Sequence, residues 1–160
     1  MTLAEILPQS LSDLNTGGAT THIAGADDWR TEIALDRHDG LASVVRSLKL
    51  TRQAEAPAGA TLAGWANGIA TRVHGLLEDL KPIEVDATVN QAILRSEAPA
   101  VHGNVRSYYE VHLRGTEEAT VQRFAADRAA GTKREAVGFT LTHEMLGKLV
   151  NDIATAASGS

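Results

Sequence analysis

The sequence contains no cysteine, few prolines and aromatic residues, and no long apolar run. Without cysteine the chain can form no disulfide, thiolate zinc site, iron–sulfur cluster or cysteine nucleophile. No stretch approaches the roughly 18 apolar residues needed to cross a membrane. The N-terminus also lacks the basic start and apolar core of a signal peptide. These absences favour a cytoplasmic protein.

Basic residues are outnumbered by acidic ones. Lys plus Arg number 15 and Asp plus Glu number 20, so the formal net charge is −5. Nucleic acids and anionic membranes select for clustered positive charge, and neither is expected as a partner. A chain of 160 residues suits one domain. A domain of that size buries about 68–70% of the surface its unfolded chain exposes, so it needs no disulfide or metal for stability.

The spacing of apolar residues predicts both helices and strands. Leucine and isoleucine recur at helical intervals near the N-terminus, behind a capping box formed by Thr2 and Glu5. Strict alternation, typical of a strand with one buried face, is clearest in 105–113. The predicted elements are a short helix (2–14), a hairpin (29–52), a central helix (61–81), antiparallel strands (83–141) and a C-terminal helix (142–154).

Helices with one apolar stripe and strands with one apolar face can bury each other. The sequence therefore predicts an α+β fold in a single domain, residues 1–160. Its antiparallel sheet would have about five to seven strands, with a meander in the second half. Two main helices would pack on one face of the sheet, and a short N-terminal helix would accompany them. The alternative is two lobes separated near 53–59.

One row of polar side chains alternates with the apolar residues of the strand 104–114. It comprises Arg106, Tyr108, Glu110, His112 and Arg114. The row places an acid, a base and two guanidiniums on one side of a sheet, which is one way to build a ligand site. The commoner alternative is a solvated face whose opposite charges pair along and across strands. Tyr108 is either an anchor for a partner protein or simply a good strand former.

Motifs for catalysis and metal binding are not recognisable. The histidines lack the spacing of a helical zinc site. Asp36, His38 and Asp39 could be metal ligands only with further ligands from elsewhere, and turn chemistry explains the Asp and Gly of that segment. No Gly-x-Ser-x-Gly elbow and no phosphate-binding loop occurs. We therefore predict no catalytic residue, no metal ligand and no cofactor, and favour a protein that is not an enzyme.

Three glycines, Gly64, Gly68 and Gly75, project from about the same side of the predicted central helix. Each glycine costs a helix about 0.8–1 kcal/mol relative to alanine. A glycine surface lets another backbone approach closely, so we expect an interface there with another helix or subunit. The alternative is an exposed face on which the glycines are tolerated.

The function that these features favour is a non-catalytic protein-binding or assembly module that acts as a homodimer. The alternative is a small-molecule-binding or enzymatic domain with its site on the polar face of 104–114. The order helix, hairpin, helix, antiparallel strands, helix is similar to that of dimeric secretion chaperones. That resemblance implies binding of extended segments of other proteins, although the extra strands between 92 and 141 depart from it.

Overall fold

The computed structural model describes residues 2–14, 17–26, 28–129 and 133–157, and contains an open antiparallel sheet of ten strands with three helices. The helices are α1 (Leu3–Ser12), α2 (Leu62–Arg72) and α3 (His143–Ala156). The strands are β1 (Thr20–Ala26), β2 (Trp29–His38), β3 (Ala42–Arg52), β4 (Leu80–Asp86), β5 (Gln91–Ser96), β6 (Ala100–His102), β7 (Val105–Arg114), β8 (Glu118–Asp127), β9 (Glu135–Val137) and β10 (Phe139–Thr142).

The strands lie in the order β1-β2-β3-β8-β7-β5-β4, with β6 paired to β7. The predicted size of the sheet, five to seven strands, is wrong. One reason is β1, whose only large apolar residue, Ile23, is exposed, so the strand has no apolar alternation. Another is that β6 and β9 have three residues each, too few to show a period.

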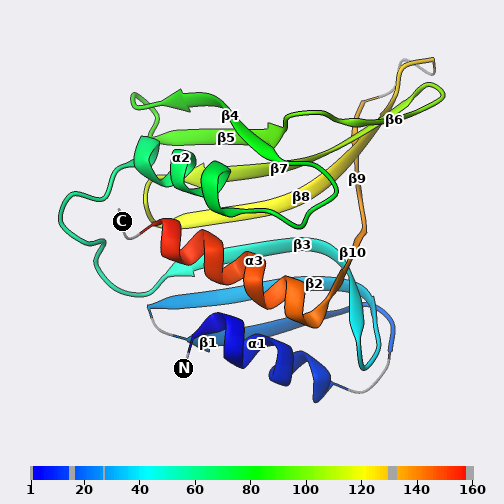
Figure 1. Ribbon diagram of the computed structural model, residues 1–160, viewed down its shortest axis with the longest axis horizontal. Helices are drawn as coiled ribbons and strands as arrows, with labels where there is room; N and C mark the ends of the chain where they lie inside the picture. Colours follow the sequence, from blue (N-terminus) through cyan, green and yellow to red (C-terminus); the bar gives the residue numbers. More distant parts are fainter. Residues whose placement is uncertain (1, 15–16, 27, 130–132, 158–160) are drawn as a thin grey trace.

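The sheet forks between β3 and β8. These strands pair only over four residue pairs, from Leu48 opposite Val121 to Thr51 opposite Glu118. Beyond them the strands diverge, and β9 pairs with β8 while β10 pairs with β3. Figure 1 shows β9 and β10 (orange, at the right) as one stretch that descends from the upper half of the sheet to the lower half. Gly138 joins β9 to β10, where a Cβ atom would lie 2.7 Å from Cγ1 of Val44.

The three helices lie side by side across one side of the sheet, with α3 between α1 and α2 (Figure 1). The indole of Trp65 in α2 donates a hydrogen bond to the Ile153 carbonyl of α3 at 2.9 Å. The same indole lies 5.7 Å from the ring of Trp29 in β2. Buried leucine, isoleucine and valine side chains from all three helices and from the central strands form one apolar cluster.

The predicted central helix, 61–81, is about twice the length of α2. Thr61 caps the helix by accepting a hydrogen bond from the Gly64 N–H at 3.0 Å, but the helix ends at Arg72. The next residues are extended or turned, and Gly75 has a φ of +104°, which does not fit a right-handed helix. The left-handed conformation at Gly75 prevents the helix from continuing toward residue 81, and β4 begins at Leu80.

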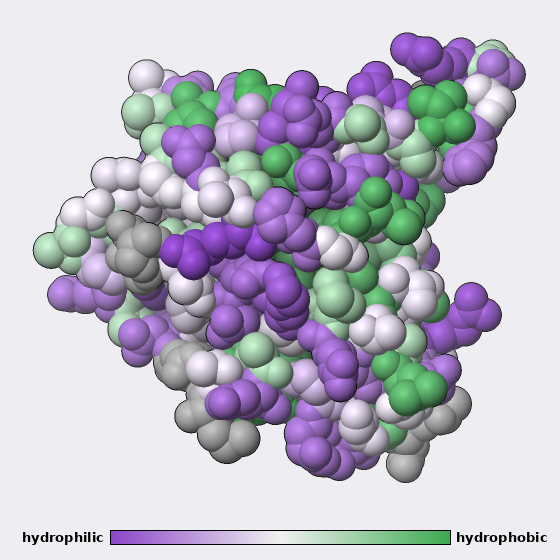
Figure 2. All heavy atoms as spheres, viewed as in Figure 1, coloured by the Kyte–Doolittle hydropathy of each residue, from purple (hydrophilic) through white to green (hydrophobic). Residues whose placement is uncertain are grey.

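The surface on the helix side is mostly hydrophilic, with small apolar patches scattered over it (Figure 2). The large apolar side chains that are exposed lie at separate places in the fold: Ile23, Leu41, Leu77, Ile83, Val85, Val89 and Val101. Within the described ranges, none of the helices has the length and apolarity required to span a membrane.

Candidate functional site

The polar row predicted from the sequence lies on β7. Tyr109, Val111 and Leu113 are buried in the apolar core, so the alternating Tyr108, Glu110 and His112 point to the opposite face of the sheet. Arg106 and Arg114 are exposed near the two ends of the strand.

Glu110 is held by two arginines and is only 7% exposed. Its Oε1 lies 3.2 Å from Nη2 of Arg95, its register partner on β5, and its Oε2 lies 2.6 Å from Nη1 of Arg134. Partial burial alone would lower the pKa of Arg134, but its contacts with Tyr108 and Glu110 outweigh that effect and raise the pKa above its usual value. The charge of the buried carboxylate is thereby compensated, and Glu110 acts as a structural anchor.

Tyr108 is fixed by the same arginines. Its hydroxyl accepts a hydrogen bond from Nη1 of Arg134 at 3.2 Å, and the guanidinium of Arg95 lies 5.3 Å from the ring centre. The ring of Phe124 on β8 lies 6.1 Å away, with Arg134 stacked on it at 3.9 Å. The ring and hydroxyl of Tyr108 are therefore held in one orientation beside the adjoining surface.

That surface contains a hollow of about 340 Å³, which we call the basic hollow. Four of its lining residues are cations, contributed by β4, β5, β7 and the residue after β8. Only one lining residue, Glu97, is acidic. The complete lining is Lys81, Ile83, Arg95, Ser96, Glu97, Pro99, Arg106, Tyr108, Ala126 and Arg128.

Three of these cations are not engaged in ion pairs within the described part of the chain. Among the described residues, Lys81, Arg106 and Arg128 form no ion pair, whereas Arg95 pairs with Glu110. Like charges that converge around a concave surface raise the local concentration of anions. The positive charge of this hollow contrasts with the net charge of −5 on the whole chain.

The structure places two residues of the predicted row, Arg106 and Tyr108, in the lining of the basic hollow. Glu110 does not line the hollow but forms an ion pair with Arg95, which does. His112 lies farther along β7, where its Nε2 is 3.1 Å from Oε1 of Gln91. Arg114 lines a separate hollow at the far end of the strand. Sequence reasoning missed Lys81, Arg95 and Arg128, because their convergence depends on a strand register that the sequence does not display.

The predicted glycine interface lies partly within the chain itself. A Cβ atom on Gly68 would lie 3.1 Å from the Cβ of Ala156, so this glycine permits the close approach of α2 to α3. Gly75 is outside the helix and packs against Met145 of α3. Gly64 contacts the hydroxyl of its own cap residue, Thr61. Two of the three glycines therefore lie next to α3, and Gly75 is still exposed.

A second cluster of titratable groups, His22, His38 and His143, lies where α1 and the start of α3 meet the sheet. The Oγ of Ser10 is 2.7 Å from Nε2 of His22, and the Oγ of Ser12 is 3.3 Å from Nδ1 of His143. Burial, followed by the nearby His143 and His38, lowers the pKa of His22. Among the described residues no group of three or more histidine, aspartate or glutamate side chains is arranged to hold a metal ion.

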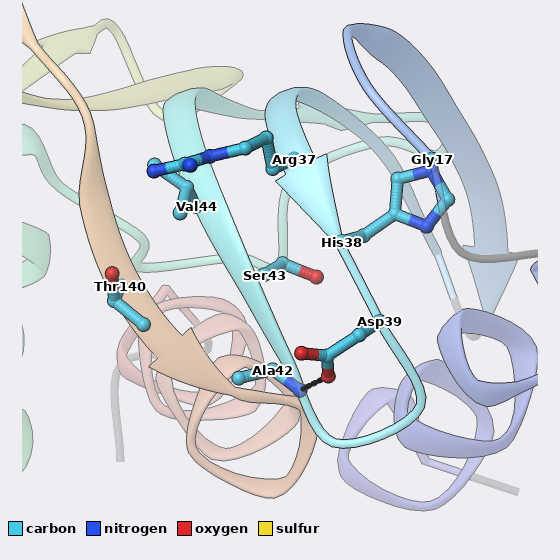
Figure 3. A pocket seen from close by; sticks show the side chains of 8 residues that line it. All are labelled: Gly17, Arg37, His38, Asp39, Ala42, Ser43, Val44 and Thr140. Atoms are coloured by element: carbon cyan, nitrogen blue, oxygen red, sulfur yellow. Dashed lines mark hydrogen bonds between the residues drawn. The ribbon is translucent and has the colours of Figure 1, made fainter.

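A shallow hollow of about 330 Å³ adjoins His38 (Figure 3). Asp39 is the one carboxylate among the described residues that line this hollow. It accepts hydrogen bonds from the N–H groups of Leu41 at 2.8 Å and Ala42 at 3.0 Å, so it stabilises the turn between β2 and β3. Those two bonds lower the pKa of Asp39. Buried nitrogen Nδ1 of His38 and the hydroxyl of Ser43, its register partner, have no hydrogen-bond partner among the described residues. The turn chemistry predicted for Asp39 accounts for this residue.

One polar pair on the core side of the sheet was not apparent from the sequence. Arg123 of β8 and Glu78, which precedes β4, form a bidentate ion pair with N–O distances of 2.9 and 3.3 Å. Ser96 donates a hydrogen bond to Glu78, and the guanidinium of Arg123 lies 4.2 Å from the ring centre of Tyr109. The pair fixes the segment between α2 and β4 to the sheet.

Comparison with known proteins finds no matching family model, no matching curated protein and no matching solved structure.

Proposed function

We propose that this protein binds a small molecule carrying a phosphate group or several carboxylates in the basic hollow. The observation that supports this function is the convergence of four cationic side chains and a single carboxylate around one concavity of about 340 Å³. That volume is within the usual range of about 300–1,000 Å³ for small-molecule sites.

The cations have distinct roles in this proposal. Arg95 is held in place by Glu110, so its guanidinium presents a prearranged edge to the ligand. Lys81, Arg106 and Arg128 line the hollow from three other strands or turns. Their positive charges repel one another, and a bound anion would replace this repulsion by attraction. Ile83 and Pro99 offer apolar surface to the uncharged part of the ligand.

Binding without catalysis is the better supported version of this function. The titratable groups that line the hollow are cations, one exposed glutamate and Tyr108, so the lining lacks the paired acid and base of a general acid–base site. Glu110, the nearest buried acid, is already bonded to two arginines. Self-association, the other expectation from the sequence, is supported by a separate feature, the open edge at β1.

Isothermal titration calorimetry tests the proposal, with pyrophosphate and citrate as probes of phosphate and carboxylate recognition. A charged hydrogen bond contributes about 1.5–3 kcal/mol, so Arg106→Ala and Arg128→Ala should each weaken binding by about tenfold or more. Arg114→Ala is the matched control, because Arg114 is an exposed arginine on the same strand outside the hollow. Circular dichroism checks that each variant is folded.

Binding of one probe and not the other identifies the preferred anion. The proposal is wrong if neither probe binds at low salt. It is also wrong if Arg114→Ala weakens binding as much as Arg106→Ala, because the attraction would then come from general surface charge.

A further inference from the structure

Strand β1 forms one edge of the sheet and, among the residues that the structure describes, pairs with β2 alone. Its seven residues pair in one unbroken register, from Thr20 opposite Leu35 to Ala26 opposite Trp29. In an antiparallel strand the backbone groups of alternate residues point to opposite sides. About half of the N–H and C=O groups of β1 therefore point away from β2, toward the open edge.

This edge lacks the features that commonly prevent edge-to-edge pairing. Its sequence, Thr-Thr-His-Ile-Ala-Gly-Ala, includes no proline, lysine, arginine, aspartate or glutamate, and its pairing has no bulge. Natural edge strands are usually protected by charges, proline, a bulge or a covering helix or loop. β1 has none of the first three, and Thr21, Ile23 and Gly25 remain exposed beside α1, so another strand can be added to this edge.

The opposite edge, β4, is protected in all three ways. It contains charged residues and Pro82, and its register shifts between Pro82 and Glu84. One edge of this sheet is thus open and the other is blocked. Pairing through β1 alone would give a closed dimer and not an extended filament.

We propose that β1 pairs antiparallel with β1 of a second copy of this chain, about a two-fold axis at Ile23. Ile23 is the middle residue of Thr20–Ala26, so this register places Ile23 opposite its own copy and Thr21 opposite Gly25. The two sheets then continue into each other across the axis.

The chemistry of the edge fits a second copy. Ile23 is 55% exposed and lies opposite Glu32, on the face of the sheet away from the buried side chains of β2, so pairing with its counterpart would cover apolar surface on that face. Each copy carries a net charge of −5, but the absence of charge on β1 leaves no like charges facing each other across the axis.

A second layer of contact lies on the helix side. The hydrogen bond between Ser10 and His22 fixes α1 over β1, and Ile6, one turn before Ser10, is half-buried on the same side of α1. Ile6 can therefore add apolar area beyond that of the strands. A stable interface needs about 800 Å² per partner, more than strand pairing alone supplies.

Disulfide trapping tests both the contact and its register. The chain has no cysteine, so a single introduced cysteine can form a disulfide only between two copies. Residues opposite each other in an antiparallel pair have Cα atoms about 4.5–5.5 Å apart, which suits a disulfide. We expect mild oxidation to convert most of the Ile23→Cys protein into a covalent dimer. Thr21→Cys, which would face Gly25, and Val85→Cys on β4 should stay largely uncrosslinked.

Light scattering gives an independent measurement. The unmodified protein should have twice the mass of one chain, and Ile23→Lys should reduce this to the mass of one chain by placing two ammonium groups face to face. Val85→Lys, the same change at an exposed position on the blocked edge, should keep the dimer mass. A single-chain mass for the unmodified protein at high concentration overturns the proposal. So does crosslinking of Val85→Cys as complete as that of Ile23→Cys. Neither result bears on the basic hollow, which lies on other strands.

Discussion

Replacing Glu78 by alanine tests whether the buried ion pair fixes the segment between α2 and β4. The side chains of Arg123 and Glu78 are only 9% and 8% exposed, and the pair is bidentate. The substitution removes the counter-charge of Arg123 and also the acceptor that the Ser96 hydroxyl uses. It therefore leaves a buried guanidinium without a carboxylate.

The expected loss is large because of this burial. Removing one partner of a buried pair costs about 3–5 kcal/mol, which is a substantial part of a typical free energy of unfolding of about 5–15 kcal/mol. Replacing both residues by leucine should cost less than Glu78→Ala, because no unpaired charge remains. The comparison separates the penalty of an orphaned charge from the loss of the pair itself.

Urea unfolding followed by tryptophan fluorescence measures the effect, since Trp29 and Trp65 are both buried. Lys148→Ala is the control, because it breaks an i,i+4 pair with Asp152 whose side chains are 52% and 20% exposed, and it should cost about 0.5 kcal/mol. A loss below about 1 kcal/mol for Glu78→Ala, the range of exposed pairs, would refute the reasoning.

Two further predictions concern α3 and the histidines. Gly68→Leu should destabilise the protein by about 1–3 kcal/mol in urea unfolding, because its Cβ already falls 3.1 Å from that of Ala156; a gain in stability would contradict the close approach of α2 and α3. Burial and the neighbouring His143 and His38 hold the pKa of His22 below its usual 6.5. As the pH falls below about 6.5, the unfolded chain takes up a proton that folded His22 does not, so the free energy of unfolding decreases until the folded pKa is passed. His22→Gln should reduce this slope, and an equal slope in both proteins would contradict the assignment.

The elements with strong periodicity were predicted close to their observed positions. Residues 105–113 alternate strictly because one face of β7 is buried, and β7 covers Val105–Arg114. Thr142 caps α3 as expected, by accepting a hydrogen bond from the Met145 N–H. In both cases local pattern and tertiary burial agree, which is when a sequence is most informative.

The central helix shows where the same reasoning fails. Its apolar spacing continues through Leu76 and Leu80, which suggested a helix as far as 81. Leu80 is instead buried in β4, where alternation and not helical spacing decides its position. Helical and strand periods thus overlap in one stretch of apolar residues, and Gly75, three residues after the end of α2, was the better guide to where the helix ends.

The buried ion pair could have been partly predicted from the position of Arg123 in the alternation of β8. Arg123 occupies the same parity as Ala119 and Val121, the buried side chains of β8. A charge at a core position needs a partner, and the partner here is Glu78, 45 residues away in sequence. Its identity depends on strand order, which alternation does not encode. The same limit hid the convergence of Lys81, Arg95 and Arg128.

The fork in the sheet links the core to the basic hollow. Phe139, at the start of β10, packs edge-on against Tyr109 at 5.5 Å and so anchors the segment that closes the fork. The same segment begins with Arg134, immediately before β9, which bonds both Glu110 and the hydroxyl of Tyr108 on the other face of the sheet. A side chain at Gly138 would press on Val44 and move this segment as a unit. The orientation of Tyr108 in the basic hollow therefore depends on the segment Arg134–Phe139, which links the hollow to the irregular part of the fold.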